Sequence, residues 1–304
     1  MTGNYRIECI PNVSTSDPEV LNKISAAVCS IPEIDLRFVD AGLSANRTVF
    51  TYLGPANAVF KATEKLIETA LANIDMQGHT GVHPRMGAVD VCPFVLLDDQ
   101  KHQTAFLAAV HQFMEHMGDW GLPIFAYEQS ARVDARRNLA VVRKGGYEGL
   151  ASRFQSGDLP DAGPTSWSEA IAKSGVTVMG ARPLMVAFNV NLAGGSRDEL
   201  LVAAKQIAGA IRERDGGLTG VKSIGWYIPD LDVVQVSCNL TKPLETGVCE
   251  VFQMVQKHAL ALGYSAPDSE LIGCIPGRQF EVCTPSTLGL GRFKPMSPNR
   301  ILPD

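Results

Sequence analysis

Positive charge, aromatic residues and long apolar runs are all scarce in this sequence of 304 residues. Basic residues number 27 against 32 acidic ones, so the formal net charge is −5 and no overall positive field attracts a polyanion. Aromatic residues make up 7% of the chain, and no apolar run approaches the roughly 18 residues that span a bilayer. The composition therefore excludes a transmembrane protein and argues against nucleic acid as a partner.

Paired cysteine motifs and targeting segments are also missing. The seven cysteines are odd in number, lie mostly in apolar runs and never form a C-x-x-C pair. The N-terminal sequence MTGNYRIECIPNV has no basic segment followed by a long apolar one. We therefore expect reduced core cysteines and a cytoplasmic protein.

Several catalytic and cofactor motifs are absent. There is no GxxxxGK[ST], no GxGxxG that opens a helix after a strand, and no GxSxG, so nucleotide-dependent chemistry has no support. His79 and His83 stand four residues apart, as in the zinc motif HExxH, but Gly78, Gly81 and Pro84 argue against the helix on which that motif depends. We therefore predict no metal site.

The composition is typical of a globular protein, and strand and helix patterns recur in the same order in both halves of the sequence. The first half predicts strands at 5–10, 35–40, 48–53 and 88–97 with helices at 17–28 and 55–73, followed by a helix at 100–117 and a strand at 123–127. The second half predicts strands at 184–192, 221–228, 233–240 and 270–275 with helices at 196–216 and 245–262. Both halves read β-α-β-β-α-β, so we predict an α/β (α+β) fold of two ferredoxin-like subdomains, with mixed sheets and helices packed on one face of each.

The domain boundary is expected in the Gly-, Pro- and Ser-rich stretch 156–175. We accordingly predict subdomains at 1–178 and 179–304, with the tail after residue 275 packed on the second. Cap residues support two helix starts: Asp17 before Pro18, and Ser196 with an acidic residue three positions later.

The densest group of reactive side chains is the loop DMQGHTGVHPRMGAVDVCPF, residues 75–94. A proline-flanked histidine on such a loop suits a general acid or base at neutral pH, and a loop histidine bonded to backbone is an equally good interpretation. The other four histidines lie on predicted helices without a titratable partner at motif spacing. A solvated role is favoured for those four.

Single charged residues give weaker indications. Asp40 and Arg47 flank a strand-to-strand turn, where side chains can face a ligand or simply satisfy backbone amides. Arg85 and Arg182 lie beside glycines, where a guanidinium group can bind a carboxylate. The arginines at 132, 136, 137 and 143 are typical of a solvated helix face, although they could attract an acidic tail of a ligand.

The chain contains several ordered blocks: ECIPNVS at 8–14, NRTVFT at 46–51, the loop at 75–94, DAGP at 161–164, GAR at 180–182, AFNVNL at 187–192, GVKSIGWY at 220–227 and VQVSCNLT at 234–241. Together these blocks resemble the glutamate formiminotransferase family. The resemblance runs from about residue 5 to the C-terminus. It implies transfer of the formimino group of N-formiminoglutamate to N5 of tetrahydrofolate in histidine degradation, by the stand-alone form without a cyclodeaminase domain.

The resemblance also implies site residues and partners. His83 corresponds to the catalytic histidine, the folate lies between the subdomains as a co-substrate with no metal or nucleotide, and the enzyme is commonly a homodimer. The stretch that resembles the folate-binding segment comprises Gly163, Pro164, Thr165, Ser166, Trp167, Ser168, Lys173, Ser174 and Gly175. Asp40 is expected to orient or charge the catalytic histidine. The residues expected to hold the donor are Arg47, Arg85, Arg182, His79 and Asn189.

The sequence departs from the family pattern at predicted site loops. Val82 replaces an acidic residue just before the catalytic histidine, and Ala162 replaces an aromatic one. Loss of the acidic residue removes a charge that could raise the histidine pKa. A diverged folate-binding relative that uses another formyl or amidine donor, or that does not turn over, is therefore the alternative.

Overall fold

The computed structural model describes residues 5–292 and 295–302, which form two compact units. The contacts divide the chain into Met1–Arg182 and Pro183–Asp304. In the described part of the chain, no helix is both long and apolar enough to cross a membrane.

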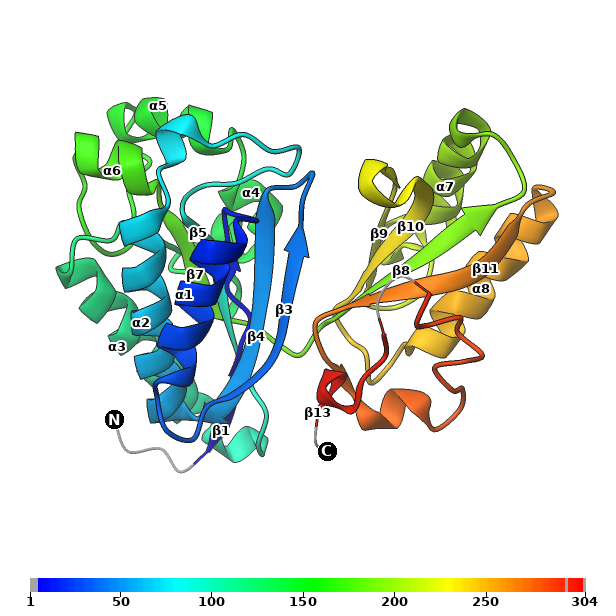
Figure 1. Ribbon diagram of the computed structural model, residues 1–304, viewed down its shortest axis with the longest axis horizontal. Helices are drawn as coiled ribbons and strands as arrows, with labels where there is room; N and C mark the ends of the chain where they lie inside the picture. The colour runs from blue at the N-terminus through cyan, green and yellow to red at the C-terminus, as the bar shows by residue number, and fades with distance from the viewer. Residues whose placement is uncertain (1–4, 293–294, 303–304) are drawn as a thin grey trace. The chain divides into compact units, whose positions relative to one another are not determined.

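The first unit is built on a seven-stranded sheet. Its strands are β1 (Arg6–Cys9), β2 (Asn12–Val13), β3 (Asp35–Gly42), β4 (Arg47–Pro55), β5 (Val89–Leu96), β6 (Ile124–Ala126) and β7 (Thr177–Ala181). Its helices are α1 (Pro18–Cys29), α2 (Ala56–Asn73), α3 (Gln103–Asp119), α4 (Leu139–Val142), α5 (Leu150–Gln155) and α6 (Glu169–Ser174). Figure 1 shows α1 and α2 side by side against one face of this sheet.

Part of the first sheet has the connectivity expected from the sequence. β3 pairs with β4, β4 with β1 and β1 with β5, all antiparallel. Because α1 leads from β1 towards β3 and α2 leads from β4 towards β5, this part is a β-α-β-β-α-β unit. β7 and β6 extend the sheet beyond β5 as parallel strands. Since β7 spans residue 178, its pairing keeps residues 179–182 in the first unit.

The first sheet is covered on both faces, whereas the sequence predicted helices on one. Cys92 and Met179 belong to a core under α1, α2 and α3, and their neighbours in the strands, Val91 and Val178, belong to a separate core that includes residues of α4, α5 and α6. Helices α4, α5 and α6 have four to six residues each. Such short helices give no usable helical periodicity, which explains why the second layer was not predicted.

The glycine-rich stretch 156–175 packs on the first unit, with Ala162 in the core under α1, α2 and α3 and Ile171 in the second core. Gly163 has a φ of +85° and lies so close to Leu122 that an added Cβ would be 2.2 Å from its carbonyl oxygen. Both the positive φ and the close approach require glycine. The contact boundary between Arg182 and Pro183 therefore follows β7 rather than falling in this stretch.

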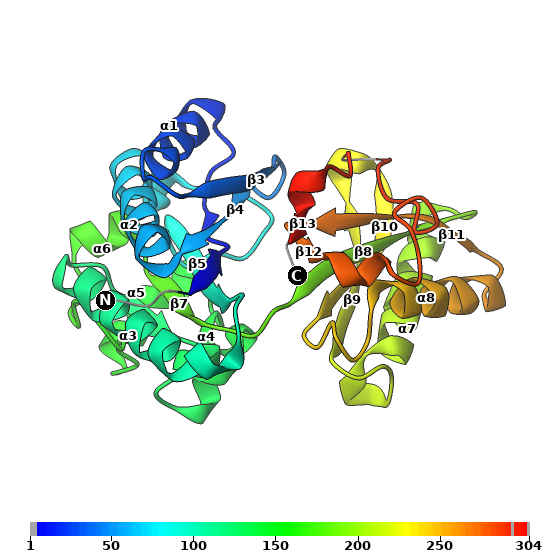
Figure 2. The same cartoon turned by 90° about the horizontal axis from the view of Figure 1, so that it is seen from below.

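The second unit is a four-stranded antiparallel sheet with two helices on one face. Its elements are β8 (Val186–Ala193), α7 (Arg197–Ile211), β9 (Val221–Ile228), β10 (Val233–Leu240), α8 (Val248–Ala261) and β11 (Ser265–Ile272). The strand order is β11-β8-β10-β9, so the strands joined by a helix never lie next to each other. The predicted order of elements is confirmed, but this sheet is antiparallel rather than mixed. Figure 2 shows α7 and α8 on the same face.

The predicted cap residues start both helices. Asp17 accepts the backbone N–H of Glu19 at 2.8 Å, and Pro18 is the first residue of α1. At the start of α7, Glu199 accepts the backbone N–H of Ser196 at 2.9 Å. These contacts satisfy N–H groups that a helix leaves free at its N-terminus.

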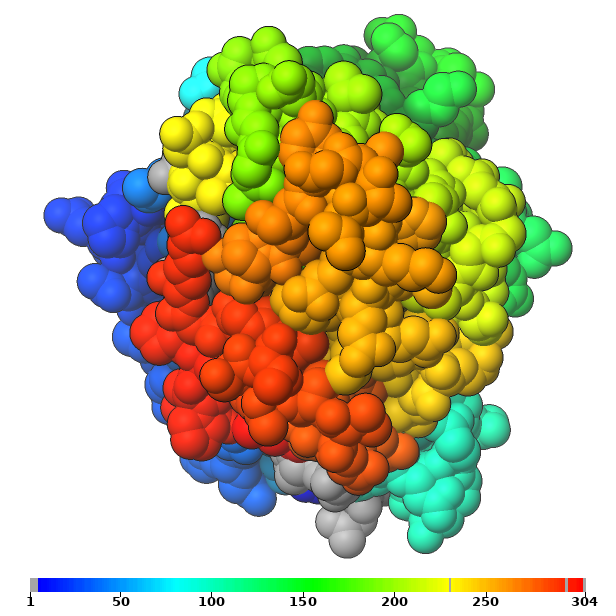
Figure 3. Space-filling model, turned by 90° about the vertical axis from the view of Figure 1, so that its right-hand side faces the viewer, coloured from blue at the N-terminus to red at the C-terminus, as the bar shows by residue number. Residues whose placement is uncertain are grey.

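The segment after residue 275 packs on the second unit, as predicted. Leu288 and Cys283 lie in its core, and β12 (Ile275–Pro276) pairs with β13 (Ile301–Leu302). Figure 3 shows this segment in red beside the orange surface of α8 and β11.

Candidate functional site

The loop that carries the paired histidines connects α2 to β5 and is anchored on the β3–β4 turn. The Val82 backbone N–H donates to the carbonyl oxygen of Ser44 at 3.1 Å. Gly81 lies so close to the same turn that an added Cβ would be 2.4 Å from a backbone carbonyl oxygen. These contacts fix the backbone immediately before His83.

His79 and Arg85, both predicted to bind the donor, contact each other within this loop. Arg85 Nε donates to His79 Nδ1 at 3.2 Å, and Arg85 Nη1 pairs with Glu148 Oε1 at 2.7 Å. His79 Nε2 donates to the carbonyl oxygen of Asn46 at 2.9 Å, because a carbonyl oxygen can only accept. His79 thereby braces the loop against the turn, and Arg85 braces it against Glu148.

His83 is half-buried, and its ring is held by the next residue in the chain. Nδ1 lies 2.7 Å from the carbonyl oxygen of Pro84, so Nδ1 carries the hydrogen and Nε2 of the neutral ring carries the lone pair. Burial, together with the positive charges of Arg47 and Arg143, lowers the pKa of His83 to about 4. The imidazole is therefore neutral near pH 7, and its Nε2 can accept a proton.

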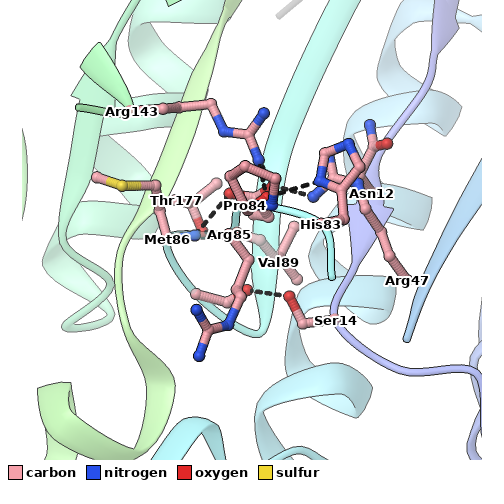
Figure 4. Close-up of polar contacts among 12 residues, drawn as sticks. Asn12, Ser14, Arg47, His83, Pro84, Arg85, Met86, Val89, Arg143 and Thr177 are labelled. Carbon is pink, nitrogen blue, oxygen red and sulfur yellow. Dashed lines mark hydrogen bonds and ion pairs between the residues drawn. The ribbon is translucent and has the colours of Figure 1, made fainter. Parts of the chain in front are cut away.

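Asp90, on β5, gathers two arginines beside this histidine. Its Oδ1 accepts the backbone N–H of Met86 at 2.7 Å, and its Oδ2 accepts from Arg143 Nη2 at 2.8 Å and from Arg47 Nη1. Figure 4 shows Arg143 reaching the carbonyl oxygen of Pro84, the atom that also binds the imidazole. One fully buried carboxylate thus positions both guanidinium groups. Below, the Asp90 cluster means Asp90, Arg47 and Arg143.

The Asp90 cluster contains two positive charges and one negative charge. Burial and the nearby charge of Arg143 hold the pKa of Arg47 well below its usual range, and burial lowers the pKa of Arg143 to about 10. Guanidinium groups nevertheless stay protonated in proteins at neutral pH. Among the described residues, the cluster therefore keeps one uncompensated positive charge next to a neutral histidine.

The stretch predicted to bind folate, 163–175, reaches the histidine loop at its C-terminal end. The Ala88 backbone N–H donates to the carbonyl oxygen of Ser174 at 2.8 Å. Gly175 lies against Gly87, where an added Cβ would be 2.4 Å from the Gly87 Cα. The backbone on the C-terminal side of the histidine is therefore fixed by this stretch.

The middle of the same stretch is more open. Trp167 packs edge-on against Phe154, with ring centroids 5.6 Å apart, and Ser168 caps α6 by accepting the backbone N–H of Ile171 at 3.4 Å. Gly163, Pro164, Trp167 and Ser174 are half-buried, and the exposed residues are Thr165, Ser166, Ser168 and Lys173.

Asp40 and Arg182 lie at other positions of the first sheet. Asp40 is a buried residue of β3, in register with Val49 of β4. Arg182 follows β7 and acts on Glu8 of β1, where its charge opposes the effect of burial. Burial dominates and raises the pKa of Glu8 to about 7. Glu8 is thus a buried acid that titrates near neutrality, which the sequence did not reveal.

Asn189 belongs to the second unit, where it joins a polar network on the sheet face away from α7 and α8. Asn189 Nδ2 and Gln235 Nε2 donate to Glu270 Oε2 at 3.3 and 3.1 Å. Gln235 also donates to Asn191 Oδ1 at 2.8 Å and accepts from Trp226 Nε1 at 3.1 Å. We name this set the Gln235 network; it comprises Asn189, Asn191, Trp226, Gln235, Asp268 and Glu270.

Sequence reasoning missed Asp90 and placed Arg143 on a solvated helix face. The sequence did contain an indication for Asp90: it lies inside the apolar run AVDVCPF, and a charged residue in a buried strand must be paired. The sequence contains no such indication for Arg143, because only tertiary packing brings the end of α4 to the histidine loop. Arg132 and Arg137, from the same group of arginines, do form exposed ion pairs.

Comparison with family models covers both units. Residues 6–182 match the model described as "Formiminotransferase domain, N-terminal subdomain", and residues 187–284 match "Formiminotransferase domain". The first match contains the histidine loop and the Asp90 cluster, and the second contains the whole Gln235 network.

Curated relatives agree with these matches. A glutamate formimidoyltransferase from Streptococcus pyogenes serotype M1 is 38% identical over 275 residues, which cover 90% of this chain and 89% of the relative. One from Thermoplasma acidophilum is 34% identical, covering 89% of this chain and 88% of the relative. The formimidoyltransferase-cyclodeaminase of Mus musculus is 34% identical, and the chain spans about half the length of relatives of this kind, 50% in the mouse protein. The chain thus belongs to the formiminotransferase family.

Proposed function

We propose that this protein transfers the formimino group of N-formimino-L-glutamate to N5 of tetrahydrofolate, giving 5-formiminotetrahydrofolate and glutamate. Relatives with the name glutamate formimidoyltransferase align with the chain over nearly their whole length. The observation that carries the proposal is the neutral His83, held on a fixed loop beside an uncompensated positive charge. The reaction needs a base for an amine proton and a cationic site for a dicarboxylate donor.

The geometry of His83 suits the proton transfers of this reaction. Attack of N5 on the amidine carbon forms a tetrahedral intermediate, which breaks down to products once N5 loses a proton and the departing glutamate nitrogen gains one. Nε2 carries the lone pair and accepts the proton from N5, while Nδ1–H stays bonded to the carbonyl oxygen of Pro84. The same nitrogen then donates the proton to the leaving group. The folate is proposed to lie along residues 163–175, which end at this loop.

The alternative is a diverged relative with another donor or without turnover. It rests largely on Val82, which stands where the family has an acidic residue. The Val82 side chain is 75% exposed, so a carboxylate there would act on His83 through water, where screening weakens the effect. The lost charge therefore gives this alternative little support.

The decisive experiment is a turnover assay with tetrahydrofolate and N-formimino-L-glutamate, in which acid converts the product to a methenyl form measured by absorbance. His83→Gln is expected to lower kcat by a factor of about 10² to 10⁴. His116→Gln, at a half-exposed helix position, is the matched control and should retain full activity. A fully active His83→Gln would remove the base role. A wild-type protein that binds tetrahydrofolate in calorimetry but forms no product would favour the alternative.

Remaining site assignments are proposals with their own tests. Asp40 is proposed to assist His83, and an unchanged kcat in Asp40→Asn would remove that role. Arg85 is proposed to contact the donor, and an unchanged KM for formiminoglutamate in Arg85→Ala would leave it only the bracing role. Arg182 and Asn189 can be tested in the same way.

The cellular context is proposed from the family resemblance and the composition. The protein is expected to be a cytoplasmic homodimer with no nucleic-acid or membrane partner and no metal or nucleotide cofactor, and the two subdomains are proposed to act as one enzyme. Sedimentation equilibrium tests the dimer. Full activity after dialysis against a chelator tests the metal-free reaction.

A further inference from the structure

The arginines of the Asp90 cluster keep hydrogen-bond donors that the described residues do not use. Arg143 donates through Nη2 to Asp90 and Pro84, and Arg47 donates through Nη1 to Asp90. Within residues 5–292 and 295–302, their other N–H groups have no hydrogen-bond partner, and Arg143 Nε is in addition buried. An unsatisfied buried donor such as Arg143 Nε costs free energy, and the other unused donors are not fully buried, so the cluster can take a further acceptor from outside the protein.

The form of the cluster selects a planar anion with one negative charge. Two guanidinium groups on one carboxylate leave one positive charge to neutralise, and their planar N–H donors match the two oxygens of a carboxylate. The receptor is already built, because Asp90 is held on β5 and by the backbone N–H of Met86 at 2.7 Å. Such preorganisation lowers the entropy cost of binding.

We propose that Arg143 and Arg47, positioned by Asp90, bind the α-carboxylate of the formimino donor, with Arg143 as the specificity-determining residue. The inference rests on the function proposed above and identifies which group of the donor this cluster holds. It assigns Asp90 as a positioning residue, since the carboxylate of Asp90 acts on the donor only through the two arginines.

The position of the cluster decides which carboxylate it takes. Arg143 and His83 share the carbonyl oxygen of Pro84, so an anion bound to Arg143 lies next to the base. In N-formimino-L-glutamate, the α-carboxylate is attached to the carbon that bears the formimino nitrogen, next to the reacting carbon. The γ-carboxylate lies at the end of a flexible side chain, and the carboxylates of folate lie beyond the p-aminobenzoyl group from N5. Only the α-carboxylate is tied closely to the reacting atoms.

The test compares donors that differ by one carboxylate. N-formimino-4-aminobutyrate lacks the α-carboxylate, and N-formimino-2-aminobutyrate keeps it but lacks the γ-carboxylate. In the wild type, loss of the α-carboxylate should lower kcat/KM about 10- to 100-fold, as expected for charged hydrogen bonds. Arg143→Gln should lower kcat/KM by a similar factor with formiminoglutamate and change it little with N-formimino-4-aminobutyrate. The KM for tetrahydrofolate should stay unchanged.

Controls separate this inference from a loss of fold. Arg137→Gln makes the same charge change at an exposed ion pair a few residues away and should behave as wild type with each donor. If Arg143→Gln does not fold by circular dichroism, Arg143→Lys is used instead, because it keeps the charge but loses the planar group. Calorimetry then compares the binding of L-glutamate and 4-aminobutyrate, and the Lys variant should lose most of the preference for glutamate.

Three outcomes would overturn the inference. An equal loss with the donor and its decarboxylated analogue in Arg143→Gln would show that the arginine does not contact the α-carboxylate. A raised KM for tetrahydrofolate alone would assign the bound carboxylate to folate. A wild-type protein that uses both donors equally well would contradict the inference while leaving the proposed function intact. If the wild type turns over none of the three donors, the proposed function itself fails, and the inference fails with it.

Discussion

The two units share a β-α-β-β-α-β order but carry polar clusters of opposite character. In the first unit, two guanidinium groups converge on Asp90, and positive charge is in excess. In the second unit, amides hold both carboxylates, since Gln235 and Asn189 donate to Glu270 and Asn191 donates to Asp268, which also pairs with the more exposed Arg292. The first cluster is suited to an anionic ligand, and the second is an acidic, largely amide-bonded network. The comparison shows that connectivity alone does not assign chemistry, which depends on the side chains placed on each sheet.

Removal of the central carboxylate is the strongest way to disrupt the first cluster. Asp90→Asn would leave two desolvated guanidinium groups without a counter-charge, and should lower the free energy of unfolding by about 3–5 kcal/mol. Denaturant unfolding measures this loss. Asp134→Asn, at an exposed pair with Arg137, is the control and should change stability by less than about 0.5 kcal/mol. A loss below about 1 kcal/mol for Asp90→Asn would mean that water already solvates both arginines.

Glu8 offers a contrast on the same sheet, because burial dominates its titration. Its pKa is about 7 in the folded protein against an ordinary 4.5, so the folded state binds the proton more tightly. The contribution of Glu8 to the free energy of unfolding should therefore be complete below about pH 4.5. It should be lost as the pH rises through about 7, by an amount of the order of 3 kcal/mol.

Unfolding of Glu8→Gln at pH 5 and pH 8 tests this expectation, because the amide removes that pH dependence. Glu68→Gln, at an exposed helix pair, should keep the wild-type profile. An identical pH profile for wild type and Glu8→Gln would rule out a raised pKa for this carboxyl.

The second network can be broken at its centre. Gln235→Leu removes the partner of Trp226 Nε1, Asn191 and Glu270, and should cost about 1–3 kcal/mol of stability. Asn239→Leu changes an exposed position of the same strand and should have little effect. If the two variants unfold at the same denaturant concentration, the network contributes nothing and the contrast with the first unit is weaker than the geometry indicates.

The pH dependence of activity gives the smallest of these effects. A base is active when deprotonated, so kcat/KM should fall on the acid side as pH drops through about 4, the pKa of His83, rather than near 6.5. In Arg143→Gln this acid limb should move upward, because a repelling positive charge is gone. The measurement is kcat/KM for both proteins over the pH range in which circular dichroism shows that they are folded. A wild-type acid limb near 6.5 would contradict the buried, positively charged setting of His83.

Much of the fold could be predicted because its elements carry strong local patterns. The cap residues Asp17 and Ser196 mark helix starts, and the apolar alternation of β10 marks a strand buried on one face. Strand β11 begins at Ser265 rather than at 270, because a register shift near Pro267 interrupts the alternation there. Strand β6 was predicted at 123–127, whereas β7 and the short helices α4, α5 and α6 were not predicted, because their place depends on contacts with distant residues.

In the candidate site, too, some features follow from the local sequence and others depend on tertiary packing. His83 stands out in the sequence because glycine and proline predict an irregular loop around it, and residues 79–87 form neither helix nor strand in the structure. The role of Asp90 and Arg143 depends on packing: they are 53 positions apart and meet only where α4 lies against the histidine loop. The sequence by itself determined the order of the longer elements, two helix caps and the histidine loop, which all depend on residues a few positions apart. The tertiary structure alone decided the protonation state of that histidine and the charge beside it, because burial and Coulomb interactions depend on distance in space rather than on separation along the chain.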